Sequence, residues 1–66
     1  MTTRETVERL PEAVRWALED LRKDYKNPCI NRDVTRARLS GYVDGLRDAG
    51  LITKYERGVL FVYGTV

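Results

Sequence analysis

A helix with two interior glycines is the feature of this sequence that most limits how the chain can fold. Residues 34–52 read VTRARLSGYVDGLRDAGLI, with apolar residues at spacings of three and four and a glycine near the end. That spacing is typical of a helix with one buried face. Gly41 and Gly45 each cost such a helix roughly 1 kcal/mol relative to alanine. Both lie away from the apolar stripe, so we expect them to permit close approach to a groove floor or a partner.

The length of 66 residues allows one domain, 1–66, with a small core. A hydrophobic fraction of 42% and a charged fraction of 33% are typical of a globular protein. Cys29 is the only cysteine and there is no histidine, which excludes an internal disulfide and the usual zinc patterns. We expect Cys29 to be a small buried side chain.

The net charge of +2 is modest, and the positive excess lies in residues 26–66. Such a weak basic footprint attracts a polyanion only loosely. The first ten residues lack the apolar core of a signal peptide, and no apolar run approaches the roughly 18 residues of a membrane span. These features predict a cytoplasmic protein with no membrane contact.

A first helix is predicted over about residues 11–25, with an extra turn before it as the alternative. Its apolar stripe consists of Val7, Leu10, Val14, Ala17, Leu18, Leu21 and Tyr25. Trp16 lies on the opposite, charged face of this helix. Either another segment of the chain covers Trp16, or it anchors a homodimer contact, because tryptophan is enriched at interfaces.

A second helix is predicted over about residues 36–49, after a short strand or turn at 28–34. Thr35 suits the N-cap position, and a start at Ser40 is the alternative. The buried stripe of this helix consists of Leu39, Val43 and Leu46. A glycine follows at the expected C-cap position and ends the helix.

Residues 51–64 have the pattern of a β-hairpin. The runs 51–55 and 59–63 are rich in β-branched and aromatic residues, and Glu56-Arg57-Gly58 between them reads as a tight turn. The sequence therefore predicts an α+β fold in which helices are followed by a C-terminal hairpin.

This order of elements resembles the winged helix-turn-helix family of DNA-binding domains, over about residues 11–64. The resemblance rests on Val34-Thr35-Arg36, on the stripe of Leu39, Val43 and Leu46, and on Ala49-Gly50-Leu51-Ile52 leading into the hairpin wing. The connection at 28–34 is shorter than the second helix usual in that family. The resemblance implies that the helix at about residues 36–49 enters the major groove of double-stranded DNA and that the wing contacts the backbone or minor groove.

Candidate DNA contacts follow from this resemblance and from side-chain chemistry. Arginine pairs with guanine edges, and hydroxyl groups contact bases or phosphates. The base-reading candidates are Thr35, Arg36, Arg38, Ser40, Gly41 and Asp44. The backbone candidates are Lys26, Arg32 and Arg47, and the wing candidates are Lys54 and Arg57. Two roles stay open for Asp44, which are contact with a cytosine amino group and an ion pair with Arg47.

The expected function is sequence-specific binding of double-stranded DNA by a small, repressor-like transcriptional regulator. A homodimer with Trp16 at its interface is expected, because one small module makes few base contacts. The small size suits a virus or mobile element. The alternative is a protein-interaction module, an adaptor or inhibitor, which the modest charge favours. We expect no enzyme activity, catalytic residue, cofactor or metal, because histidine and a phosphate-binding loop are lacking.

Overall fold

The computed structural model describes residues 2–66, which form four helices and no strand. The helices are α1 (Thr3–Glu8), α2 (Glu12–Lys26), α3 (Arg32–Asp48) and α4 (Lys54–Gly64). The predicted α+β class with a C-terminal wing is therefore wrong, because the described part of the chain is all-α.

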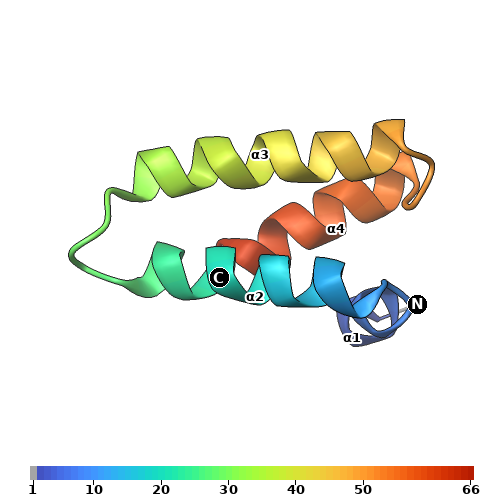
Figure 1. Cartoon of the computed structure of the whole chain (residues 1–66), viewed down its shortest axis with the longest axis horizontal. Coiled ribbons are helices and arrows are strands. Elements are labelled where there is room, and N and C mark those ends of the chain that lie inside the picture. The colour runs from blue at the N-terminus through green and yellow to red at the C-terminus, as the bar shows by residue number, and fades with distance from the viewer. Residues whose placement is uncertain (1) are drawn as a thin grey trace.

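The helices form a small bundle in which α2 and α3 lie side by side and antiparallel (Figure 1). A loop joins these two helices at one end of the molecule. Helix α4 packs against α1, α2 and α3, and α1 lies at the end away from the loop. The two ends of the molecule are thus built from different segments of the chain.

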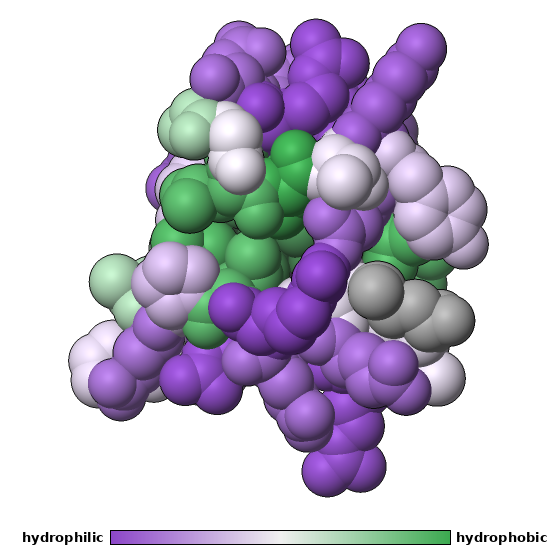
Figure 2. Space-filling model, turned by 90° about the vertical axis from the view of Figure 1, so that its right-hand side faces the viewer, coloured by the Kyte–Doolittle hydropathy of each residue, from purple (hydrophilic) through white to green (hydrophobic). Residues whose placement is uncertain are grey.

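The core is made of aliphatic side chains from all parts of the bundle. Leu18, Leu39 and Leu60 are completely buried, one from each of the three longer helices. The rest of the buried cluster consists of Leu10, Leu21, Val43, Leu46 and Ile52. Burying each such side chain contributes about 1.5–3 kcal/mol. Figure 2 shows the end formed by α1 and the α3–α4 turn, where apolar side chains gather in the middle and hydrophilic ones surround them.

Residues 51–64 form a turn and helix α4 in place of the predicted hairpin. The Thr53 hydroxyl accepts a hydrogen bond from the Glu56 amide at 3.1 Å, and the Glu56 carboxylate accepts one from the Thr53 amide at 2.9 Å. This capping box starts the helix. Glu56, Leu60 and Gly64 then recur every fourth residue on the buried face. Tertiary burial of that face overrides the high strand propensity of the segment.

The predicted glycine stop of the second helix is confirmed at Gly50, whose φ of 78° lies in the left-handed region. The Gly50 amide donates to the Arg47 carbonyl at 2.9 Å, and the Leu51 amide donates to the Leu46 carbonyl at 3.0 Å. This is the Schellman arrangement that closes a helix. The chain therefore reverses directly into α4 and does not extend into a strand.

Helix α3 begins at Arg32, which is earlier than either predicted start. The Asn31 side chain accepts hydrogen bonds from the amides of Asp33 at 2.8 Å and Val34 at 3.4 Å. Asparagine caps a helix at least as well as threonine. Thr35 is instead fully buried inside the first turn, so neither Thr35 nor Ser40 starts the helix and residues 28–34 contain no strand.

Cys29 is exposed in the loop between α2 and α3, so its predicted burial is wrong. Its amide donates to the Asn27 side chain at 2.9 Å. The loop satisfies its backbone groups locally and lies at the surface, as connecting segments usually do. Cys29 lies in this loop because α2 ends at Lys26 and α3 begins at Arg32.

The exposed glycine Gly41 provides a first prediction about stability. An added Cβ at position 41 would meet nothing within 4 Å. We expect Gly41→Ala to raise the free energy of unfolding by about 0.5–1 kcal/mol, because alanine is the better helix former. Gly64→Ala is the matched control, since its Cβ would collide with the buried Leu39 side chain and should destabilise. Urea denaturation followed by circular dichroism measures both, and destabilisation by Gly41→Ala would contradict the placement of this residue.

The capping box at the start of α4 provides a second prediction. Thr53→Ala removes the acceptor for the Glu56 amide and should lower the free energy of unfolding by about 1 kcal/mol. The neighbouring Lys54→Ala, at an exposed position that no cap uses, should change it by less than about 0.5 kcal/mol. Equal effects of the two substitutions in urea denaturation would show that Thr53 does not cap a helix.

Candidate nucleic-acid interface

Positive charge is concentrated at the end of the molecule where α2 meets α3. Residues 22–38 contain six basic and two acidic side chains, a net charge of +4 in a chain of net charge +2. We call the five exposed cations of this segment the basic end, namely Lys23, Lys26, Arg32, Arg36 and Arg38. Four of them were predicted contacts, two for the DNA backbone and two for base reading. The α2–α3 hairpin brings these four together.

Tyr25 organises two of the arginines at the basic end. The guanidinium carbons of Arg32 and Arg36 lie 5.2 and 5.9 Å from the centre of its ring. Arg36 also donates a hydrogen bond to the Tyr25 hydroxyl at 3.1 Å, and this bond raises the pKa of the guanidinium. The ring therefore holds both cations close together at the surface.

Two carboxylates partly neutralise the basic end. Arg36 pairs with Asp33 at 3.3 Å, and Arg38 pairs with Asp24 at 3.7 Å. Exposed pairs of this kind contribute only about 0–1 kcal/mol, so a phosphate can compete for the same arginines. Lys23, Lys26 and Arg32 form no ion pair within residues 2–66.

The remaining base-reading candidates do not share one outer face of α3. Thr35 is fully buried, and its hydroxyl donates to the Asn31 carbonyl at 3.5 Å. Ser40 and Asp44 turn toward α4, where both accept hydrogen bonds from Arg57. Gly41 is exposed. The structure therefore places Arg32, Arg36 and Arg38 in the first two turns of α3, while Ser40 and Asp44 in its middle contact α4.

The predicted wing residues occupy different places because no wing exists. Arg57 lies on α4, is partly buried and pairs with Asp44, so it is not at the tip of a hairpin. Asp44 thus pairs with Arg57, and the ion pair expected between Asp44 and Arg47 is not formed. Lys54 is exposed at the start of α4, and Arg47 pairs with Asp48 at 3.8 Å. Arg47 and Lys54 flank the turn between α3 and α4, which lies at the end of the bundle away from the α2–α3 loop (Figure 1).

Lys23 of the basic end and the neighbouring Tyr25 were not predicted as functional residues. The sequence pattern did not single out Lys23, and Tyr25 was assigned to the apolar stripe. The spacing of Lys23 and Lys26 near the end of one helix was a readable signal. The stacking of Tyr25 on Arg32 and Arg36 depends on the early start of α3 after Asn31, which was not predicted.

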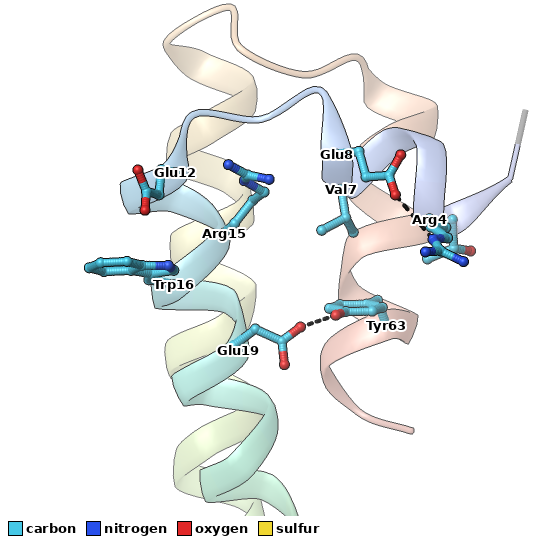
Figure 3. A pocket seen from close by; sticks show the side chains of 9 residues that line it. Arg4, Val7, Glu8, Glu12, Arg15, Trp16, Glu19 and Tyr63 are labelled. Carbon is cyan, nitrogen blue, oxygen red and sulfur yellow. Dashed lines mark hydrogen bonds and ion pairs between the residues drawn. The ribbon is translucent and has the colours of Figure 1, made fainter.

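A hollow of about 690 Å³ opens between α1, α2 and α4, far along the molecule from the α2–α3 loop (Figure 3). We call it the tryptophan cleft. It is lined by Thr3, Arg4, Val7, Glu8, Glu12, Arg15, Trp16, Glu19 and Tyr63. Tyr63 donates a hydrogen bond to Glu19 across it, and that bond raises the pKa of the tyrosine. Trp16 stands at the rim with 66% of its surface exposed, so no segment within residues 2–66 covers it.

In comparisons with protein-family models, curated protein sequences and solved structures, no match to this chain was found. Among the described residues, no helix is both long enough and apolar enough to cross a membrane.

The Asp44–Arg57 contact provides a third prediction. The pKa of Asp44 lies below its ordinary value of 3.8 because Arg57 donates a hydrogen bond to it. A carboxylate with a lowered pKa stabilises the fold above that ordinary value, and the contribution is lost as pH falls through the folded pKa. Between about pH 5 and pH 2, wild-type stability should fall more steeply than that of Asp44→Asn. Asp48→Asn should retain the wild-type slope, and a wild-type slope in Asp44→Asn would contradict the contact.

Proposed function

We propose that this domain binds double-stranded DNA through phosphate contacts made by its basic end. The observation that carries the proposal is the set of five exposed cations that the α2–α3 hairpin brings together, opposed within residues 22–38 only by Asp24 and Asp33, which leaves a net charge of +3. Phosphate contacts from lysine and arginine supply most of the affinity of nonspecific DNA binding. Double-stranded DNA is also the partner that the sequence favours. The contact surface differs from the predicted one, because it is the basic end and not a wing and the outer face of one helix.

Sequence preference is the finer part of the proposal and depends on Arg36 and Arg38. Both are exposed on the first two turns of α3, and arginine recognises guanine through paired hydrogen bonds. The hydrogen bond from Arg36 to the Tyr25 hydroxyl already orders the Arg36 side chain, so Arg36 loses less conformational freedom on binding. Regulation of transcription would follow from such a preference.

A protein-interaction function is the second candidate, favoured by the outer face of α4. Tyr55 and Val62 are 73% and 58% exposed, and a shallow hollow lined by Thr3, Tyr55, Gly58, Val59 and Val62 lies along this face. Exposed apolar surface of this kind is typical of protein interfaces. Absence of DNA binding would leave this candidate in place of the first.

A fourth prediction tests DNA binding with two double variants of equal charge. Lys26→Ala plus Arg32→Ala removes two cations from the basic end, and Arg47→Ala plus Lys54→Ala removes two from the opposite end. Fluorescence anisotropy with a labelled mixed-sequence duplex, at several salt concentrations from about 50 to 200 mM, measures the dissociation constant. The first variant should lower the slope of log K against log salt by about two, whereas the control should keep the wild-type slope.

Two results would overturn the proposal. One is the absence of wild-type binding at the lowest salt concentration. The other is an equal loss of slope in both double variants, which would mean that only the total charge matters. Selection of bound sequences from a random duplex pool then tests the finer part, because Arg36→Ala plus Arg38→Ala should remove any enriched motif.

A further inference from the structure

Trp16 is a large apolar side chain that the fold of a single chain leaves without cover. It is the only tryptophan, it is 66% exposed, and it projects from α2 at the rim of the tryptophan cleft (Figure 3). Tryptophan is enriched among the residues that anchor protein interfaces. These features favour a docking surface at the cleft, and the charges at its rim indicate what docks there.

Two charged groups beside Trp16 lack partners of opposite sign. Glu12 and Arg15 both line the cleft from α2, three residues apart, and neither forms an ion pair within residues 2–66. The Nε atom of Arg15 is also buried without a hydrogen-bond partner. The other rim charges are already engaged, since Arg4 pairs with Glu8 at 3.0 Å and Glu19 accepts a hydrogen bond from Tyr63.

We propose that the tryptophan cleft is the contact surface of a homodimer with two-fold symmetry. A two-fold axis repeats each contact, so a surface with one unpaired cation and one unpaired anion three residues apart on one helix is complementary to itself. Glu12 of each copy then pairs with Arg15 of the other. A partner of a single charge sign would satisfy only one of these groups and leave the other uncompensated at the interface.

The reciprocal ion pairs fix how the two copies are arranged. Helix α2 of one copy lies antiparallel to α2 of the other, with the two-fold axis between Ala13 and Val14. Trp16 of each copy then faces Pro11 of the other, at the α1 end of the opposite cleft. Trp16 becomes buried against the mouth of that cleft, beside Val7 of the other copy.

This arrangement has a consequence for DNA binding, and that consequence alone depends on the proposed function. Lys26 lies 12 to 13 residues from the two-fold axis along α2, so at about 1.5 Å per residue the two copies of Lys26 are roughly 37 Å apart. Paired half-sites on DNA are separated by one helical turn, about 34–36 Å. The dimer therefore brings two basic ends to a spacing that two successive turns of DNA can meet.

A fifth prediction tests the dimer by its mass and by the emission of the single tryptophan. Sedimentation equilibrium of the wild type should show a shift from 7.6 kDa toward twice that mass as concentration rises, with a blue shift of the tryptophan emission over the same range. Trp16→Ala should raise the dimer dissociation constant by more than about tenfold while circular dichroism stays unchanged. Val62→Ala, which removes exposed apolar surface outside the cleft, is the matched control and should dimerise normally.

Charge reversal tests the two-fold pairing itself. Glu12→Arg and Arg15→Glu should each weaken the dimer, because each places like charges opposite one another. The double variant Glu12→Arg plus Arg15→Glu recreates both reciprocal pairs and should restore the dimer to within about threefold of the wild type. A wild type that stays monomeric at millimolar concentration, or a double variant no better than the single ones, would overturn the proposal.

The dimer and DNA binding can fail separately. A monomeric wild type that binds DNA with the predicted salt slope would refute the dimer and leave the proposed function. A dimer that does not bind DNA would refute the proposed function and leave the interface.

Discussion

The fold depends on how the buried carboxylate of Glu56 is satisfied. Glu56 is 5% exposed, accepts a hydrogen bond from the Thr53 amide and pairs with Arg9, which directly follows α1. A buried carboxylate without partners would cost several kcal/mol. One side chain therefore starts α4 and ties it to the segment that joins α1 to α2. With α4 fixed as a helix, the hydrophobic faces of α2 and α3 have a third helix to pack against.

The sequence predicts the parts of this fold that depend on regular spacing. The apolar stripes of α2 and α3, and the glycine stop at Gly50, follow from local pattern alone. Helix α4 was missed because its β-branched and aromatic residues favour a strand, although the Thr53 and Glu56 pair is a readable capping box. The start of α3 was missed because Asn31 and Thr35 are both good caps, and only tertiary packing decides that Thr35 is buried.

The candidate site was predictable in composition but not in arrangement. Lys26, Arg32, Arg36 and Arg38 belong to the basic end because α2 and α3 form an antiparallel hairpin, which places their adjoining termini together. Arg57 was expected at a hairpin tip and instead engages Asp44 and Ser40, a contact between residues far apart in sequence. The molecule therefore has two distinct surfaces, the basic end and, near the opposite end, the tryptophan cleft.

Amide chemical-shift mapping is the most direct test of DNA binding by the basic end, because it locates the DNA contact without any substitution. A short mixed-sequence duplex is titrated into ¹⁵N-labelled protein at low salt, with the protein at a concentration where its mass is constant. Shift changes are expected to be concentrated in residues 22–38, with the amides of Val7 and Tyr63 in the tryptophan cleft unchanged. Changes centred on the cleft or on α4, or no changes at all, would contradict DNA binding through the basic end.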